Sequence, residues 1–317
     1  MLTWTGRVVT ASALLCAGLL TVGCQKHKPK LASIELYSGY VSTEGGVLYG
    51  RVSNGPPDPH PEPNQSKIVR ALETLEALDA SALPFASVEV SCDGHPLPAI
   101  SDDRGYLQVQ LPSGIKGPKS AVSVTLRQTG FSADSVQTEV PVYDGNPGLA
   151  VLSDVDDTVL DSQITDRKKM IENALLRSTW ELKTFPGAPE ALTRLSQGKP
   201  VFYLSGSPWG FHRRIYSYFQ RTGFPSGTLI LKRFSKDPLL DQMAFKYPHL
   251  KAVADALPNK KFLLFGDSGE KDPEIYARFR SEFPSRVEQI FIHLVTAEPT
   301  DSSRFTGMRV FKNWTEL

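Results

Sequence analysis

The chain has 317 residues, of which 40% are hydrophobic and 22% are charged. This composition is that of ordinary globular proteins, and it excludes collagen-like, fibrous and intrinsically disordered chains. The 35 Lys and Arg residues nearly balance the 34 Asp and Glu residues, which leaves a formal net charge of +1. A protein that holds nucleic acid through a global positive field is therefore excluded too. The length suits roughly two domains.

The first 24 residues have the pattern of an exported lipoprotein. Arg7 precedes an uncharged apolar run at 8–22, and the run ends in Gly23-Cys24. It is too short for a membrane-spanning helix of about 20 residues but suits the apolar core of a signal peptide. Residues 20–24 resemble a bacterial lipobox, with Thr21 where Leu is usual. We expect a signal peptide at 1–23, lipidation at Cys24 and a tether at 24–30. A plain secretory signal peptide and a soluble N-terminus are the alternatives.

The lipobox resemblance also implies a location. Gln25, not Asp, follows Cys24, which resembles the enterobacterial sorting signal for the outer membrane. We therefore expect a cell-envelope protein that is lipid-anchored through Cys24 to the outer membrane and faces the periplasm, since several acyl chains make an anchor effectively stable. Once Cys24 is acylated and Cys16 is removed, Cys92 is the remaining thiol, so no intramolecular disulfide is expected.

Residues 31–145 are expected to form a β-sandwich-like domain, because short alternating or β-branched runs recur between turn clusters such as 92–95 and 102–105. A Pro-rich insert at 54–63 leads into 65–79, where apolar residues at helical spacing predict a helix packed on the sandwich. No catalytic spacing occurs in this half. The expected strands are 34–40, 46–52, 87–91, 106–111, 121–127 and 135–142.

Residues 146–317 are expected to form an α/β domain with a doubly wound parallel sheet. After the turn at 144–148, buried-type strands alternate with helical stretches. Ligands of such sheets bind beyond the carboxyl ends of the strands. The expected strands are 149–153, 200–204, 228–232, 261–265 and 287–295, and the expected helices lie around 166–179, 189–197, 210–221, 246–256 and 273–282.

Polar clusters follow three of these strands. Asp154-Val155-Asp156-Asp157-Thr158 comes first, Ser205-Gly206-Ser207-Pro208 second, and the segment from Gly266-Asp267 to Asp272 third. Residues two apart at a strand end point to one side, so Asp154 and Asp156 can share a pocket. Paired carboxylates repel unless a cation or a shared proton holds them, and oxygen ligands from two strand ends suit Mg²⁺.

In this order the motifs resemble the haloacid dehalogenase superfamily of aspartate-nucleophile phosphatases. They supply a DxDxT motif, a serine that closes the second strand, a lysine and a GDxxxxD motif. More narrowly, 152–158, 204–209 and 266–276 look like the catalytic domain of the actin-patch-associated phosphatidate phosphatase family. The resemblance covers about residues 149–317. It implies a haloacid dehalogenase-like fold and an Mg²⁺-dependent phosphatase that works through an aspartyl-phosphate intermediate.

The resemblance assigns roles to four acidic residues. Asp154 would attack the substrate phosphorus, and Asp156 would protonate the leaving oxygen and then activate water. Mg²⁺ would be held by the Asp154 side chain, the main-chain carbonyl of Asp156 and Asp267. Asp272 would be a ligand or would support the ligands from behind.

It also assigns the groups that bind the phosphoryl oxygens. Ser205 would bind one of these oxygens, and Thr158 would steady the loop or help to bind it. A lysine should pair with the phosphoryl charge; Lys246 stands where the family pattern puts it, and Lys251 is the alternative.

Two neighbouring features have simpler interpretations. Trp209 is expected in the core rather than as a wall of the substrate site. Arg213 and Arg214 are expected on a solvated helix face rather than against lipid headgroups.

The substrate is the least determined part of the prediction. The resemblance implies phosphatidate, hydrolysed to diacylglycerol and phosphate, with a phospholipid or membrane surface as the partner. Only a modest insertion at about 161–199 separates the first two motifs, which favours an open site for a bulky phosphomonoester. The alternatives are a periplasmic phosphatase for soluble or protein phosphomonoesters and a non-enzymatic envelope binding or scaffold lipoprotein.

Overall fold

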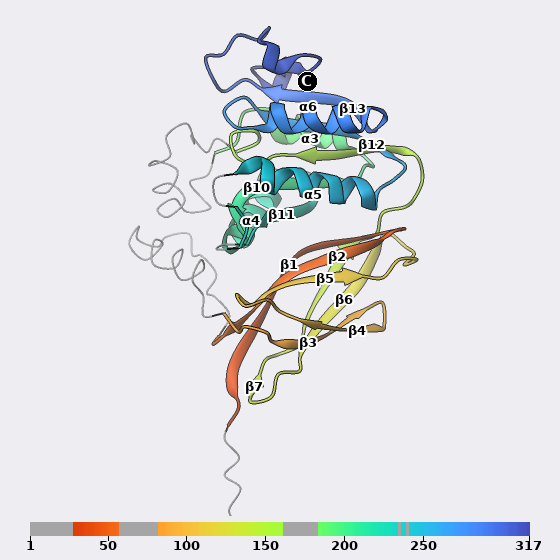
Figure 1. The fold of residues 1–317 in the computed structure, drawn as a ribbon, viewed down its shortest axis with the longest axis vertical. Coiled ribbons are helices and arrows are strands. Elements are labelled where there is room, and N and C mark those ends of the chain that lie inside the picture. Colours follow the sequence, from red (N-terminus) through yellow and green to blue (C-terminus); the bar gives the residue numbers. More distant parts are fainter. Residues whose placement is uncertain (1–27, 57–81, 161–182, 234–235, 239–240) are drawn as a thin grey trace, which may run out of the picture.

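The computed structural model describes residues 28–56, 82–160, 183–233, 236–238 and 241–317 (Figure 1). The expected signal peptide, Cys24 and the helices expected at 65–79 and 166–179 lie outside the described residues, as does most of the expected insertion at 161–199. Within the described part of the chain, no helix is long and apolar enough to cross a membrane.

The described residues of the N-terminal domain form two four-stranded sheets, with the orders β5-β2-β1-β7 and β4-β3-β6-β8. Alternation explains the sandwich: along β3, Val88, Val90 and Cys92 are buried, while Glu89 between them is exposed. The buried residues of both sheets form one apolar core, to which β2 adds Leu48. The strands are β1 (Lys30–Ser42), β2 (Gly45–Asn54), β3 (Ser87–Cys92), β4 (His95–Ile100), β5 (Tyr106–Leu111), β6 (Lys119–Leu126), β7 (Phe131–Ser132) and β8 (Val136–Pro141).

Strand β4 was not expected from the sequence, where His95 was taken as the end of a turn. Its prolines, Pro96 and Pro98, lack the N–H that a central strand needs. The structure places β4 at the edge of its sheet, where β3 is its one strand partner among the residues that the structure describes. A strand can therefore form here despite the two prolines, because an edge strand tolerates proline.

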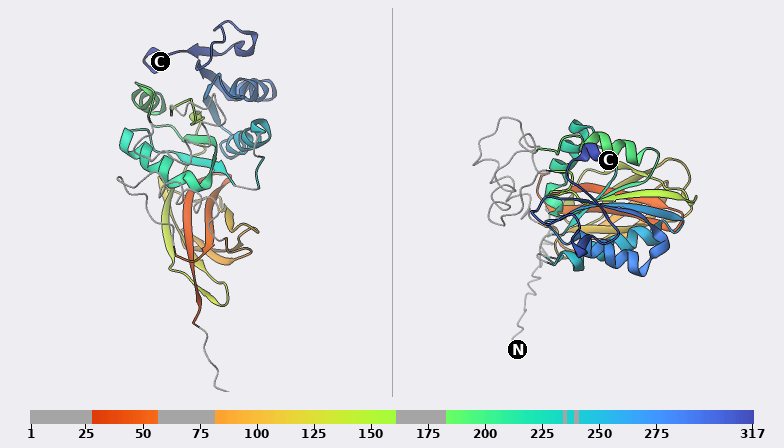
Figure 2. Two further views of the ribbon diagram at one scale, coloured as in Figure 1. Left: turned by 90° about the vertical axis from the view of Figure 1, so that its left-hand side faces the viewer. Right: turned by 90° about the horizontal axis from the view of Figure 1, so that it is seen from above.

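The C-terminal domain is a six-stranded sheet, with the order β11-β10-β9-β12-β13-β14 and every pairing parallel. Figure 2 shows α3 and α4 on one face of this sheet and α5 and α6 on the other. The expected fold class, a doubly wound parallel sheet after an antiparallel sandwich, is confirmed. The elements are β9 (Gly148–Ser153), α3 (Ala188–Ser196), β10 (Val201–Pro208), α4 (His212–Thr222), β11 (Thr228–Lys232), α5 (Gln242–Ala256), β12 (Lys260–Asp267), α6 (Asp272–Glu282), β13 (Val287–His293) and β14 (Arg309–Phe311).

The strand order determines where a ligand would bind. From β9 the chain adds β10 and β11 on one side, and then crosses to add β12 and β13 on the other. In open α/β sheets the crevice for a ligand lies at such a reversal, beyond the carboxyl ends of the strands. The ends of β9, β10 and β12 are therefore brought together, and all three carry the polar clusters recognised in the sequence.

The two domains share an aromatic interface. Trp209, in a short 3₁₀ turn (Trp209–Phe211) after β10, is 2% exposed and stacks on Tyr37 of β1, with 5.0 Å between ring centroids and 5° between planes. The ring of Tyr49 lies at 5.0 Å on the same indole. Nearby, the backbone N–H of Leu229 donates to Ser38 Oγ at 3.0 Å. Trp209 is thus a core residue, as expected.

The side chains of Arg213 and Arg214 on α4 are partly exposed, and Arg213 has a partner that was not expected. Arg213 forms an ion pair with Glu35 of β1, with 2.5 Å between Nε and Oε1, so it joins the domains. The guanidinium of Arg214 lies 5.4 Å from the centroid of the Phe211 ring. The sequence did not indicate the ion pair of Arg213, because it depends on the packing of β1 beside this helix.

Candidate active site

Asp154 is the residue at which β9 leaves the sheet. Its backbone N–H still donates to the carbonyl of Phe265 in β12, at 2.8 Å, so the start of the loop remains attached to the neighbouring strand. The side chain is 1% exposed. Its Oδ2 accepts a hydrogen bond of 2.9 Å from Thr158 Oγ1, which orients the carboxylate.

The rest of the loop is held from the far edge of the sheet. Asp157 has a φ of 53°, a left-handed conformation that turns the chain back. Its carbonyl oxygen lies 3.0 Å from Nδ1 of His293 at the end of β13. The indole Nε1 of Trp314 donates to the carbonyl of Thr158 at 3.1 Å. These two aromatic residues therefore fix the backbone on which Asp154 and Thr158 are placed.

Lys246 reaches from α5 into a group of carboxylates. Its Nζ lies 2.7 Å from Asp154 Oδ1, 2.7 Å from Asp272 Oδ1 and 2.9 Å from Glu270 Oε2. Burial opposes its charge, but these carboxylates outweigh burial, and the pKa of Lys246 is raised well above its ordinary value. The side chain is therefore an ammonium ion at any ordinary pH.

Lys251, the alternative lysine, lies elsewhere. Its side chain is exposed and pairs with Asp255 on the same helix, at 2.9 Å. Five residues of helix separate it from Lys246, which turns it by about 140° from the buried face. Of the two candidates, only Lys246 contacts Asp154.

Asp267 and Asp272 hold the third motif together. Asp267 Oδ1 accepts from the backbone N–H groups of Gly269, at 2.6 Å, and Glu270, at 3.0 Å. Both oxygens of Asp272 also have partners, Lys246 Nζ for Oδ1 and the backbone N–H of Asp267 for Oδ2, at 3.3 Å. By contrast, Asp267 Oδ2 is buried and has no hydrogen-bond partner among the described residues. Asp267 Oδ2 is therefore a buried oxygen that could accept a further partner.

The donor set fits a hard divalent cation. Carboxylate oxygens of Asp154, Asp267, Glu270 and Asp272 all lie within 4.8 Å of one another. Burial, together with the neighbouring carboxylates, raises the pKa of Asp154 and of Asp267 well above the ordinary value. One ammonium group cannot balance four carboxylates, and oxygen ligands are those that Mg²⁺ prefers. The orphaned Oδ2 of Asp267 is the atom most plainly suited to such an ion.

Asp156 is oriented by two hydroxyl groups at the end of β10. Ser205 Oγ donates to Asp156 Oδ2 at 2.7 Å, and Ser207 Oγ donates to the same oxygen at 3.1 Å. The backbone N–H of Ser207 in turn donates to Ser205 Oγ at 2.9 Å. Asp156 is half-buried, whereas Asp154 is fully buried. The two carboxylates of the DxDxT motif therefore have different surroundings, as an acid or base and a nucleophile require.

The sequence analysis did not single out three residues that the structure brings to this site: Ser207, Glu270 and Lys232. The strand-end rule could have found two of them, since Ser207 stands two residues after Ser205 and Lys232 closes the expected strand 228–232. Lys232 is 6% exposed, and burial lowers its pKa. Glu270 lies within the polar segment 266–272 that follows the strand, but its contact with Lys246 could not be predicted because it depends on the packing of α5.

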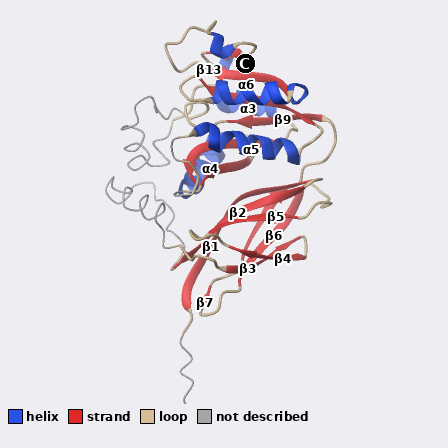
Figure 3. Cartoon of the chain, in the orientation of Figure 1, coloured by secondary structure: helices blue, strands red, loops and turns tan. Residues whose placement is uncertain are grey.

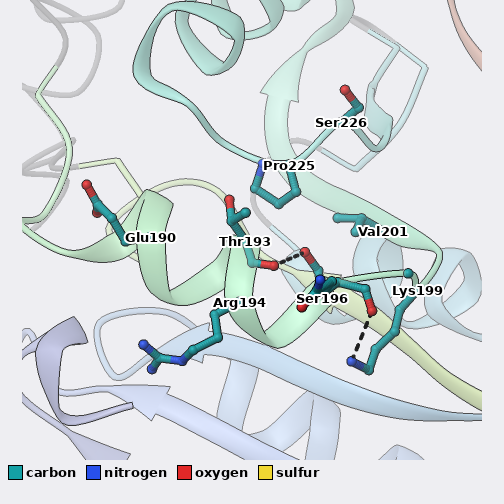
Figure 4. A pocket seen from close by; sticks show the side chains of 10 residues that line it. Glu190, Thr193, Arg194, Ser196, Lys199, Val201, Pro225 and Ser226 are labelled. Carbon is teal, nitrogen blue, oxygen red and sulfur yellow. Dashed lines mark hydrogen bonds between the residues drawn. The ribbon is translucent and has the colours of Figure 1, made fainter.

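A pocket lies at the opposite end of the sheet. Val201, the first residue of β10, lies in its wall together with Arg194 of α3, Lys199 and Pro225 (Figure 4). None of the predicted site residues lines it. The chemistry-bearing residues are therefore gathered at the carboxyl ends of the strands and not around this pocket.

Comparison with known proteins relates the C-terminal domain to a catalytic domain. Residues 149–294 match the family model described as the catalytic domain of phosphatidate phosphatase APP1. The chain is 28% identical over 209 residues to phosphatidate phosphatase APP1 of Saccharomyces cerevisiae, covering 63% of this chain and 35% of that protein. It is 29% identical over 194 residues to an uncharacterized protein of Schizosaccharomyces pombe, covering 58% and 31%. The chain thus spans about a third of the length of these relatives, and the resemblance to the catalytic domain is confirmed.

Solved structures are more distant. A putative haloacid dehalogenase-like hydrolase from Burkholderia xenovorans aligns with a TM-score of 0.34 and 13% identity, covering 54% of this chain and 94% of that one. A carbohydrate acetylesterase from Xanthomonas citri aligns with a TM-score of 0.27 and 12% identity, covering 80% and 66%.

Proposed function

We propose that the C-terminal domain is a divalent-metal-dependent phosphatase that works through phosphorylation of Asp154. The observation that carries the proposal is the contrast between two carboxylates on one loop: Asp154 is buried against Lys246 and Thr158, while Asp156 is half-buried beside Ser205. The match of residues 149–294 to a phosphatidate phosphatase catalytic domain supports it.

In the first step a carboxylate oxygen of Asp154 forms a bond to phosphorus, and the bond from phosphorus to the ester oxygen breaks. Asp156, protonated, gives its proton to the leaving oxygen. In the second step Asp156 takes a proton from water as the water oxygen attacks phosphorus, which releases phosphate and restores Asp154. Ser205 and Ser207 keep Asp156 directed at this place throughout.

The metal proposed for the site is Mg²⁺. Asp154, Asp267 and Glu270 would supply side-chain oxygens for it, and the family resemblance implies the main-chain carbonyl of Asp156 as a further ligand. Asp272, whose oxygens contact Lys246 Nζ and the backbone N–H of Asp267, would be a further ligand or would support the ligands from behind. When bound, Mg²⁺ would neutralise the charge on the phosphoryl oxygens in a reaction that depends mostly on positioning and electrostatics.

The proposed substrate is phosphatidate or a related lipid phosphomonoester. The name of the yeast relative supports this choice, and so does the lipobox pattern at Cys24, since a lipid anchor would hold the enzyme beside lipid substrates at high effective concentration. The proposed location is accordingly the outer membrane, with the enzyme facing the periplasm. A labelled fatty acid should be incorporated at Cys24 and should be lost in Cys24→Ser; a labelled Cys24→Ser protein would contradict the anchor.

The activity is tested by phosphate release from phosphatidate in mixed micelles and from a panel of soluble phosphomonoesters, with and without Mg²⁺. Asp154→Asn should reduce release by about 10³-fold or more, as expected for loss of a nucleophile. Asp255→Asn, an exposed carboxylate on α5, is the matched control and should be fully active. Full activity of Asp154→Asn would contradict the proposed mechanism. Phosphate release from soluble esters but not from phosphatidate would contradict the proposed lipid substrate.

A further inference from the structure

Arg304, in a short 3₁₀ turn after β13, binds the loop that follows β12. Its guanidinium donates to the main-chain carbonyl of Ser268, at 2.6 Å, and to that of Glu270. Its other N–H groups donate to the carboxylates of Glu274, at 2.6 and 3.1 Å, and of Glu298, at 3.1 Å. These contacts use all five N–H donors of a guanidinium, in a fork that the ammonium group of a lysine cannot reproduce.

The contact with Ser268 fixes one peptide unit from both sides. In a trans peptide the C=O of one residue and the N–H of the next point in opposite directions. The carbonyl of Ser268 accepts from Arg304, and the N–H of Gly269 in the same peptide unit donates to Asp267 Oδ1 at 2.6 Å. Arg304 therefore holds this N–H toward Asp267. Oδ1 is engaged as a result, while Oδ2 is the buried oxygen without a hydrogen-bond partner among the described residues.

The contact with Glu270 fixes a second peptide unit in the same way. The carbonyl of Glu270 accepts from Arg304, and the N–H of Lys271 donates to Oε1 of Gln242, the first residue of α5, at 2.9 Å. This peptide unit is therefore held between Arg304 and α5. Asp267 and Glu270, whose carboxylates are proposed as metal ligands, thus stand on a backbone that one guanidinium spans.

We propose that Arg304 is a positioning residue that sets the affinity of the site for its divalent cation, by holding the backbone of the loop that carries Asp267 and Glu270. This inference rests on the metal site of the proposed function, but not on its substrate or its chemical steps. Arg304 lies outside residues 149–294, which the family model matches. It therefore adds to the site a residue that the recognised motifs do not contain.

The test measures Mg²⁺ binding to the full-length protein, by isothermal titration calorimetry and by the rise in Tm that Mg²⁺ produces. Arg304→Lys keeps the positive charge but cannot span the two carbonyl groups. The Kd for Mg²⁺ should therefore rise by about 10- to 100-fold, the range for loss of a group that orients metal ligands. Phosphate release at limiting Mg²⁺ should fall, and saturating Mg²⁺ should restore kcat, because Arg304 is not among the proposed reacting groups.

Arg286→Lys is the matched control. Arg286 also donates to main-chain carbonyl groups, those of Lys260, at 2.8 Å, Ala254, at 2.9 Å, and Leu257, at 2.7 Å. These groups lie at the end of β12 opposite to Asp267. The variant should lose stability through the same kind of contact and keep the wild-type Kd for Mg²⁺, which separates positioning of the metal ligands from a general effect on folding.

If Arg304→Lys does not fold, Glu298→Gln replaces a charged partner of the guanidinium by a neutral one and should raise the Kd for Mg²⁺ by a smaller factor. An unchanged Kd in the folded variant, or an equal rise in Arg286→Lys, would overturn the inference and leave the proposed function standing. A wild-type protein that binds no Mg²⁺ would overturn both. Mg²⁺ binding that depends on Arg304, in a protein that hydrolyses no phosphomonoester, would support the inference and overturn the proposed function alone.

Discussion

Two buried regions meet at the end of β10, and they are held together in opposite ways. Around Trp209, neutral rings from both domains stack on one another and need nothing else. Around Asp154, several carboxylates surround the ammonium group of Lys246. Burial of like charges costs free energy unless a cation compensates it, whereas burial of apolar rings is favourable by itself. The first region needs no further group, whereas the second has the charge pattern that the proposed metal ion would balance.

The short segment between the regions links their properties. Ser205 and Ser207 contact Asp156, and Trp209 follows two residues later between Tyr37 and Tyr49. The β-sandwich therefore holds the outer end of the loop whose inner end orients the proposed acid. Changes at the interface should reach the site through this segment.

Trp209→Ala should have the largest effect on stability. It empties a buried site that both domains share, and such truncations cost about 3 to 5 kcal/mol of unfolding free energy. Urea denaturation measures this loss, and phosphate release should fall with it because the β10 loop loses its outer support. Phe85→Ala, at an aromatic residue that is 64% exposed, is the control and should change stability little. An unchanged unfolding free energy in Trp209→Ala would mean that the domains do not depend on this contact.

Mg²⁺ should stabilise the charged region and not the aromatic one. At a free concentration of 100 times the Kd, binding to the folded state alone adds about 2.7 kcal/mol, which calorimetry would record as a higher Tm. Asp267→Asn should abolish most of this gain, because Asp267 carries the buried oxygen without a partner among the described residues. Asp255→Asn should keep it. A Tm of the wild-type protein that does not change when Mg²⁺ is added would contradict the proposed metal site.

The aromatic interface should lose unfolding free energy at acidic pH, and this loss should be smaller than the two effects above. His212 lies beside Tyr37 and Trp209, both of its ring nitrogens lack hydrogen-bond partners among the described residues, and burial lowers its pKa to about 3. In the unfolded chain this histidine has its ordinary pKa near 6.5, so at pH values between about 3 and 6.5 the unfolded chain binds a proton that the folded chain does not. Stability from this residue is therefore complete above about pH 6.5 and is lost as the pH falls toward 3.

His212→Phe removes this titration and keeps an aromatic ring. We expect the variant to be more stable than the wild-type protein by up to about 2 kcal/mol at pH 5, with a smaller difference at pH 8. Urea denaturation at the two pH values measures the difference. His95→Phe, which replaces an exposed histidine of β4, is the control variant. A constant difference between wild type and His212→Phe across pH would show that packing, not proton binding, explains it.

Several site residues could be predicted because they depend on local rules. Asp154, Ser205 and Asp267 each stand where an apolar run ends, and a parallel sheet brings such ends to one edge. Ser207 and Lys232 obey the same rule but carry no motif, so they were passed over. Strand β4 was missed because its prolines disfavour a strand in general, although not at an edge.

What the sequence determined by itself was the alternation of strands and helices and the placement of carboxylates at strand ends, since both follow from the periodicity of side chains along a local backbone. The tertiary structure decided which groups touch. Lys246 meets three carboxylates because α5 packs across the ends of strands far apart in the chain, and Trp209 is enclosed because β1 of the sandwich lies against α4 and β11. Those contacts depend on strand order and domain packing, which no short stretch of residues contains.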